Sequence, residues 1–353
     1  MRGAIVDVAA LALALVLAIV KPNAEWVERH FANGWYPPVQ TTVTGLTNRV
    51  PFAVTDLEAL LVFGGLIAWW IVRLRRSRAR LRTAAMMAAH TIGVASILTV
   101  IFFCAWGFNY QRPPMASRVA FDPARVNPQS VDAYAKTIVA ALNTTAPEAH
   151  AHALDELTME TRLQADFEPV VRALGDRAYV TLTRPKSTLI NRYLSFAGIG
   201  GLFDPFAYET IVNADFLDFE RPFAIAHEWG HAAAFADETD ANYIAALTTQ
   251  RSPSPYIRYS GLVWIYGYLP REVTNKYPLS PLVTADLTDS YRRYMRYLNR
   301  IVFNVQWSAY DKYLKANRVQ SGVVSYTLFV NFLVGTARDE HGLPIVRGER
   351  GGR

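Results

Sequence analysis

The chain has 353 residues, of which 51% are hydrophobic and 19% charged, so it is more apolar than an average soluble protein and long enough for two or three domains. Its formal net charge is +6, but six arginines lie together in RLRRSRARLR, and without them the charge is zero. This balance excludes an extended phosphate-binding surface, so we expect no nucleic-acid partner. The single cysteine, Cys104, excludes a disulfide framework and a thiolate metal site within one chain.

Three long apolar runs occupy the first third of the chain. Each comes close to the roughly 20 helical residues that cross a bilayer. We expect membrane helices at about 3–20, 57–72 and 84–108, with a basic loop at 73–83, so that 1–112 is a transmembrane region with lipid as its partner. The first run is also short enough for a signal peptide, but no small-residue cleavage site follows it, and we interpret it as retained.

The arginine-rich loop predicts the orientation of the membrane helices, because short basic loops stay in the cytoplasm. We therefore expect a multi-pass protein of the cytoplasmic (inner) membrane, with a cytoplasmic N-terminus and an extracytoplasmic C-terminal part. The loop after the first helix is rich in aromatic residues, and Trp26, Trp35 and Tyr36 are expected to anchor it at the membrane surface. His90 is expected to face a neighbouring membrane helix.

The rest of the chain divides into three parts. Four prolines indicate an irregular linker at 113–129, a domain follows at 130–345, and the Gly-rich tail 346–353 is expected to be disordered. The domain begins with amphipathic helices, continues with alternating patterns typical of short strands at 177–183 and within 194–215, and ends in further helices. This order predicts a mainly helical α+β domain with a small β-sheet.

The stretch AIAHEWGHAAAFADETDANYIAAL carries the strongest chemical signal. His227 and His231 are four residues apart, so on a helix they lie on one face and can bind one ion. Glu228 stands beside them without being a ligand, where it would act as general base toward a water that zinc activates. The alternative is an alanine-rich core helix. The upstream strands, the acids that follow and the cost of burying unpaired charge favour the metal site.

A catalytic zinc ion needs a third protein ligand, and three acids follow the histidines. They are Asp237, Glu238 and Asp240. We favour Glu238, because its longer side chain tolerates approach from a separate helix, and because Asn242 lies one turn further on, where it can bond a histidine as an outer-shell partner. Two imidazoles and a carboxylate suit Zn²⁺, although manganese and iron accept the same ligands.

Four separated segments resemble a bacterial membrane-protein family catalogued as domain of unknown function 3810, regarded as zincin-like. They are the HEWGH…ETDANY core, VPFAVTDLEALL, WGFNYQRPP and YDKYLKANRVQSGVVSY. The resemblance covers roughly residues 30 to 335. It implies three membrane helices followed by a zincin-like domain, with zinc ligands His227, His231 and Glu238 and the base Glu228. Members often have Gly where this chain has Ala234, so the turn toward Glu238 is expected to be made differently.

These observations predict a membrane-bound zinc metallopeptidase that hydrolyses a peptide or protein substrate outside the cytoplasm. By analogy with zincins, the strand around AYETIVNAD would pair with an extended peptide, and Tyr256 and Tyr259 could donate to the oxyanion. Asp240 and Asn242 would support the ligands from the outer shell. Two alternatives stay open. One is a non-catalytic scaffold or sensor that a metal stabilises, and the other is a hydrolase of cell-wall amides.

Overall fold

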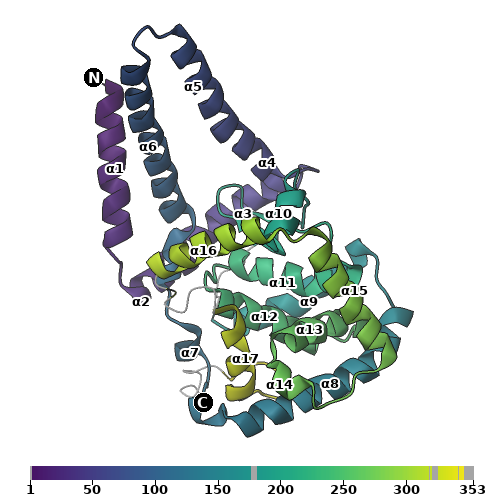
Figure 1. The fold of residues 1–353 in the computed structure, drawn as a ribbon. Coiled ribbons are helices and arrows are strands. Elements are labelled where there is room, and N and C mark those ends of the chain that lie inside the picture. The colour runs from purple at the N-terminus through teal and green to yellow at the C-terminus, as the bar shows by residue number, and fades with distance from the viewer. Residues whose placement is uncertain (1, 176–180, 318, 320–324, 341, 346–353) are drawn as a thin grey trace.

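The computed structural model describes residues 2–175, 181–317, 319, 325–340 and 342–345. Most of these residues are helical, and two short strands form the sheet, as the predicted fold class requires. Three long helices stand together at one end of the molecule, and the other helices form a body beneath them (Figure 1). The predicted tail 346–353 lies outside the described residues.

The long helices correspond to the three apolar runs. They are α1 (Arg2–Ile19), α6 (Arg80–Ala105) and a continuous helix of α4 (Val54–Ala59), a π-helical segment (Leu60–Gly64) and α5 (Gly65–Arg76). Val54–Arg76 and Arg80–Ala105 are each long and apolar enough to cross a membrane, and α1 makes a third if it is taken with the helical segment that follows it at an angle of 108°. The helices extend into the predicted loop 73–83, because arginine favours helix and its long stem reaches past the apolar part.

A polar contact joins α1 to α6. His90 bonds with Asp7 through Nδ1 and Oδ2, and a Cβ atom on Gly93 would lie 2.2 Å from Asp7 Oδ1. Glycine at this position therefore leaves room for the aspartate between the two helices. The expectation that His90 faces a neighbouring helix is confirmed.

The segment after α1 is helical and not a surface loop. It contains α2 (Ala24–Trp26), a π-helical segment (Val27–Trp35) and α3 (Tyr36–Thr47). Trp26 and Trp35 are exposed, as expected of anchors, but Tyr36 is buried and donates a hydrogen bond to the carbonyl oxygen of Ala232, 2.7 Å away. The prediction that Tyr36 anchors the chain at the membrane surface is therefore wrong, because its hydroxyl has a partner inside the body.

The remaining helices form the body. They are 3-10 turns at Gly107–Gln111, Pro123–Arg125 and Asp218–Glu220, and α7 (Met115–Arg118), α8 (Pro128–Ala151), α9 (Glu156–Ala173), α10 (Asn191–Ala197), α11 (Arg221–Ala232), α12 (Glu238–Arg251), α13 (Pro255–Tyr268), α14 (Arg271–Thr274), α15 (Pro281–Tyr297), α16 (Arg300–Ala316) and α17 (Ser325–Gly335). One hydrophobic core unites most of them with Val27, Phe31, Tyr36 and Trp106, and Leu194 of α10 packs in a second, smaller cluster with Ala53 and Ile211. Side chains from the predicted transmembrane region thus share a core with the predicted external domain.

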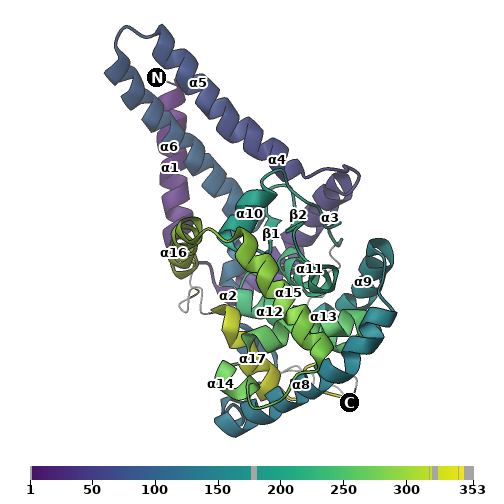
Figure 2. The ribbon, with the colours of Figure 1, turned by 45° about the vertical axis from the view of Figure 1, so that its right-hand side comes forward.

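The sheet is an antiparallel pair of β1 (Gly201–Asp204) and β2 (Glu209–Val212). Lys186 bonds to the outer side of β2, since its N–H donates to the Thr210 carbonyl and its carbonyl accepts from Val212 N–H. The strand predicted at 177–183 lies partly outside the described residues, and its described end, 181–183, is not a strand. Figure 2 shows the two strands above α11, between that helix and the long helices.

Candidate metal centre

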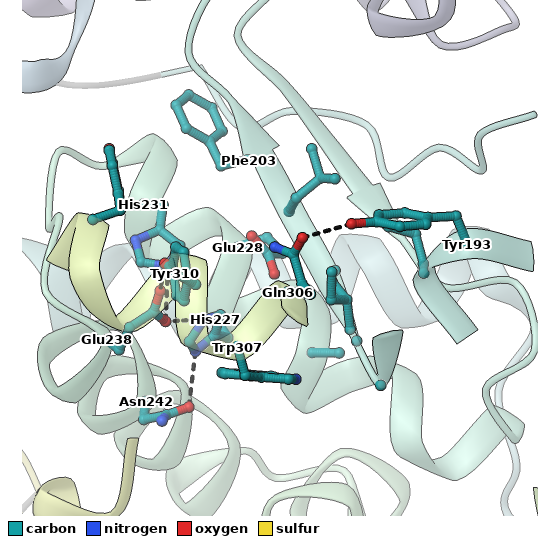
Figure 3. Close-up of a pocket in the computed structure, with 18 of the residues that line it drawn as sticks. Tyr193, Phe203, His227, Glu228, His231, Glu238, Asn242, Gln306, Trp307 and Tyr310 are labelled. Atoms are coloured by element: carbon teal, nitrogen blue, oxygen red, sulfur yellow. Dashed lines mark hydrogen bonds and ion pairs between the residues drawn. The ribbon is translucent and has the colours of Figure 1, made fainter. Parts of the chain in front are cut away.

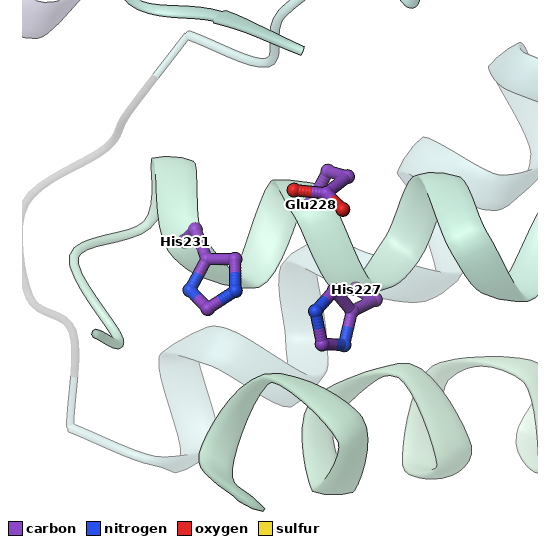
Figure 4. Close-up of side chains that lie close together, drawn as sticks. All are labelled: His227, Glu228 and His231. Atoms are coloured by element: carbon purple, nitrogen blue, oxygen red, sulfur yellow. The ribbon is translucent and has the colours of Figure 1, made fainter. Parts of the chain in front are cut away.

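Helix α11 brings His227 and His231 to one face, one turn apart (Figure 4). Pro222 stands at the start of the helix, where a missing N–H costs nothing. His227, Glu228 and His231 present ligand atoms that all lie within 4.8 Å of one another. The helix is buried along nearly its whole length, so its polar side chains need partners.

The histidines are oriented through their Nδ1 atoms. His227 Nδ1 lies 2.8 Å from Asn242 Oδ1, and His231 Nδ1 lies 2.8 Å from the carbonyl oxygen of Phe235. Both partners are acceptors, so each Nδ1 donates to its partner and each Nε2 faces the cluster. This is the arrangement that outer-shell acceptors impose on metal-binding imidazoles. Asn242 thus bonds to a histidine as expected, and its role in the outer shell of a metal stays a prediction.

The turn after α11 places the next acid. Ala234 adopts the left-handed conformation with φ of 69°, the amide of Phe235 donates to the Gly230 carbonyl, and the amide of Ala234 donates to the His231 carbonyl. These two bonds define a Schellman turn. Alanine thus takes the conformation that glycine favours, so the expectation of a different turn is wrong. The same turn points the Phe235 carbonyl at His231.

Glu238 is the acid that reaches the histidines. Its Oε2 lies 3.1 Å from His227 Nε2 and 3.4 Å from His231 Nε2 (Figure 3). Ligands bound to zinc at about 2.0–2.2 Å in a tetrahedron lie roughly 3.3–3.6 Å from one another, close to these spacings. Oε2 is buried and accepts no well-aligned hydrogen bond from the described residues. Tyr310, on α16, bonds to the other oxygen, Oε1.

The other two acids are not paired with the histidines in the described structure. Asp237 caps α12 and accepts from Thr239 N–H at 2.7 Å. Burial and the nearby Asp237 raise the pKa of Asp240 to about 8. The structure therefore favours Glu238 among the three candidates, and it gives Asp240 no contact that would make it the outer-shell partner we expected.

The charges of the cluster are strongly coupled. Burial raises the pKa of Glu228 to about 7, although the two histidines lower it. Burial raises the pKa of Glu238 too, but His231 and His227 outweigh it and hold the pKa well below its usual value. Burial lowers the pKa of His231, yet Glu238 raises it to about 9. Glu238 is thus ionised at neutral pH, whereas Glu228 can exchange a proton there.

Strand β1 packs against Glu228. A Cβ atom on Gly201 would lie 2.6 Å from Glu228 Oε1, so only glycine fits at this position. The amide of Asn213 bonds to the Gly200 carbonyl, and by strand alternation the backbone groups of Gly201 and Phe203 point away from β2. The edge beside the centre is therefore β1. Our expectation that the strand around AYETIVNAD forms this edge is wrong, because Lys186 covers the outer side of β2.

A cavity of about 760 Å³ reaches the centre. It is lined by β1, by the two histidines with Glu228 and Glu238, and by a face of α16 that carries Phe303, Trp307 and Tyr310. We had not singled out these three residues for the site, although their spacing at i, i+4 and i+7 is the signal of one helix face. Tyr256 and Tyr259, our oxyanion donors, do not line the cavity. Tyr259 donates to Asp286 Oδ2 at 2.5 Å instead, because α13 turns these tyrosines toward the core.

The carbonyl groups at the end of α11 have partners from the membrane-proximal segments. Trp106 Nε1 donates to the His231 carbonyl at 3.1 Å, and Tyr36 donates to that of Ala232. Arg112 donates to the Ala234 carbonyl at 3.0 Å and stacks on the Phe235 ring. The end of the third apolar helix is thereby bonded to the helix that carries both histidines.

Comparison with known proteins gives one match. The model of the family described as "Protein of unknown function (DUF3810)" covers residues 31–334. None of the curated proteins and none of the solved structures compared with the chain is similar enough to count as a match. The family description names no activity, and the cluster of His227, Glu228 and His231 lies inside the matched region. The chain belongs to the DUF3810 family.

Proposed function

We propose that this protein is a membrane-anchored, zinc-dependent peptidase with an extracytoplasmic active site. The observation that carries the proposal is the position of Glu238 Oε2, 3.1 and 3.4 Å from the Nε2 atoms of His227 and His231. Three ligands in this geometry, reached by an open cavity, are typical of a catalytic and not a structural zinc site. The open cavity therefore supports a hydrolase over the scaffold that we kept as an alternative.

The residues fit the ion chemically. His227 and His231 would bind it through Nε2, and Glu238 through Oε2, the buried oxygen that otherwise lacks an aligned donor. Zinc held there would lower the pKa of a water molecule and polarise a substrate carbonyl. Manganese and iron accept the same donors, but the Glu228 side chain beside the histidines fits hydrolysis.

Glu228 would move the proton. Its Oε2 is buried and has no hydrogen-bond partner among the described residues, so it can accept a proton from the attacking water. The oxygen of that water bonds to the substrate carbonyl carbon, and Glu228 passes the proton to the amide nitrogen. The C–N bond then breaks and leaves a carboxylate and an amine.

The edge of β1 would hold the substrate. The outward backbone groups of Gly201 and Phe203 can pair with an extended peptide, as an added strand does. Tyr310, which bonds to Glu238 and lines the cavity, would keep that ligand in place. The six arginines around the connection of α5 to α6 support a cytoplasmic position for that end of the helices and an extracytoplasmic position for the site.

The test is peptide hydrolysis by the purified full chain, with metal content measured on the same samples. We expect about one zinc per chain, and cleavage of a random peptide library that Glu228→Gln lowers by at least about 100-fold with zinc retained. Full activity of Glu228→Gln would contradict the proposed mechanism. Hydrolysis of cell-wall fragments without hydrolysis of peptides would support the cell-wall alternative instead.

A further inference from the structure

The mouth of the cavity lies at the ends of the apolar helices. On one side, Tyr313 of α16 packs on Phe102, near the end of α6, with ring centroids 6.4 Å apart. On the other side, Ile190 lines the cavity, and the amide of its neighbour Leu189 donates to Asp56 Oδ2 at 2.9 Å, in the first turn of α4. Figure 1 shows α16 lying across the lower ends of the long helices, and Figure 2 shows it nearly end-on at the lower end of α1. Both sides of the mouth are thus at the level where the helices would leave the membrane.

Large apolar side chains are exposed at this level. Leu189 is 90% exposed, Ile301 77% and Val305 67%, and Ile190 is half exposed. Ile301 and Val305 are one turn apart on the outer face of α16, whereas Phe303 and Trp307 line the cavity from its inner face. We call Leu189, Ile190, Ile301 and Val305 the rim. An apolar rim is costly in water but suits the boundary between headgroups and acyl chains.

The charges beside the rim agree with that position. Arg300 and Lys312 are exposed on α16, where they can reach lipid headgroups. The residues that link the rim to the catalytic centre are mainly aromatic, from Tyr193 and Phe303 at the mouth to Trp307 beside the histidines. Tyr193 donates to Gln306 Oε1 at 2.5 Å and so joins the two sides of the mouth.

We propose that the rim lies in the outer surface of the bilayer and that the substrate is a membrane-anchored polypeptide, cleaved in the segment next to its anchor. The substrate class rests on the proposed peptidase function, whereas the position of the rim does not. An anchored chain that lies along the membrane surface meets the mouth directly, and its first extended residues can reach the edge of β1. Hydrolysis consumes one water and leaves one product in the membrane.

The position of the rim is tested without activity. In a Cys104→Ala background, an environment-sensitive dye is attached to Val305→Cys, and for control to Ala140→Cys, an exposed position on α8 at the opposite end of the body. The full chain is placed in vesicles of phosphatidylethanolamine and phosphatidylglycerol that contain quencher-labelled lipid. We expect quenching at 305 to exceed that at 140 by about three-fold or more. Equal quenching would overturn the position.

The substrate class is tested with one fluorescent peptide library, with and without an N-terminal palmitoyl chain. In vesicles we expect the palmitoylated library to be cleaved at least about ten-fold faster, because confinement to the surface raises its effective concentration. Ile301→Asn with Val305→Asn should reduce that ratio, and Ala140→Asn should not. Equal cleavage of the two libraries would overturn the substrate class. No cleavage of either library, with the dye in lipid, would contradict the peptidase function and leave the rim in place.

Discussion

Gly201 and Glu228 pack so closely that a Cβ atom at residue 201 would lie 2.6 Å from Glu228 Oε1 and 2.8 Å from the carbonyl oxygen of Ile211. The strand that would hold a substrate and the carboxylate that would move its proton are therefore positioned by the same contact. A side chain at 201 must displace one of them.

Gly201→Ala is expected to lower kcat by about 100-fold, because small displacements of a catalytic group are costly. The ligands do not touch residue 201, so zinc content should stay near that of the unmodified chain. Gly45→Ala is the control, since no atom lies within 4 Å of a Cβ there. A Gly201→Ala protein with normal kcat would show that Glu228 is not held by β1.

Glu238→Gln is expected to weaken zinc binding by more than about 100-fold, because loss of a ligand exceeds the cost of losing an outer-shell partner. Asp240→Asn is the matched change two residues on, and it should bind zinc normally. The zinc content of the two variants, measured after dialysis against a weak chelator, shows which of them has lost a ligand. Loss of zinc from Asp240→Asn alone would move the third ligand to Asp240.

Ala234→Gly is expected to stabilise the protein by about 1 kcal/mol, because an L-residue pays roughly 1–2 kcal/mol in the left-handed conformation and glycine does not. Part of that gain is lost to the greater freedom of glycine in the unfolded chain. Thermal unfolding in detergent measures the change. A lower midpoint for Ala234→Gly would contradict the turn described here.

Glu160 should make stability depend on pH. Burial and the neighbouring Glu156 raise the pKa of Glu160 to about 7, despite Arg184 and Arg221. Because the raised pKa favours the protonated folded state, this stabilisation is present below the unfolded pKa near 4.5 and is lost as pH rises through 7. Glu160→Gln should therefore be more stable than the unmodified chain at pH 8, by about 1–2 kcal/mol since water screens the half-buried group, and not at pH 4.

Unfolding midpoints of the two proteins across this range check the prediction. Glu168→Gln, an exposed change on the same helix that removes only an ion pair with Arg172, should shift stability by less than about 0.5 kcal/mol at any pH. If the difference in stability between Glu160→Gln and the unmodified chain were the same at every pH, the raised pKa of Glu160 would be contradicted.

The spacing of residues along the sequence was sufficient to predict those features that a single helix determines. The four-residue spacing puts His227 and His231 on one face wherever the helix lies, and the apolar runs near the N-terminus are long enough to form helices without any partner. Glu238 was favoured among three acids from its reach and from Asn242 one turn further on. Its position also depends on the left-handed Ala234, which periodicity does not reveal.

The predictions that were wrong concern features that depend on contacts between segments far apart in the sequence. Tyr256 and Tyr259 lie on a helix of the expected kind, but the packing of α13 decides which way they point. The edge strand was misassigned because Lys186, more than twenty residues before Ile211, covers β2. Tyr310 comes from a helix about seventy residues beyond Glu238, and no local pattern links them.

The bonds at the end of α11 have a consequence for how the protein can be handled. Trp106, Tyr36 and Arg112 donate to carbonyl groups in or just after the last turn of α11, and all three precede residue 113. The His231 carbonyl also accepts from the Ala234 amide. A shortened, water-soluble chain that begins at the predicted linker would lose these donors and leave the last turn of the histidine helix to fray. Assays of the histidine helix therefore need the full chain, because segments before residue 113 supply hydrogen-bond donors to its last turn.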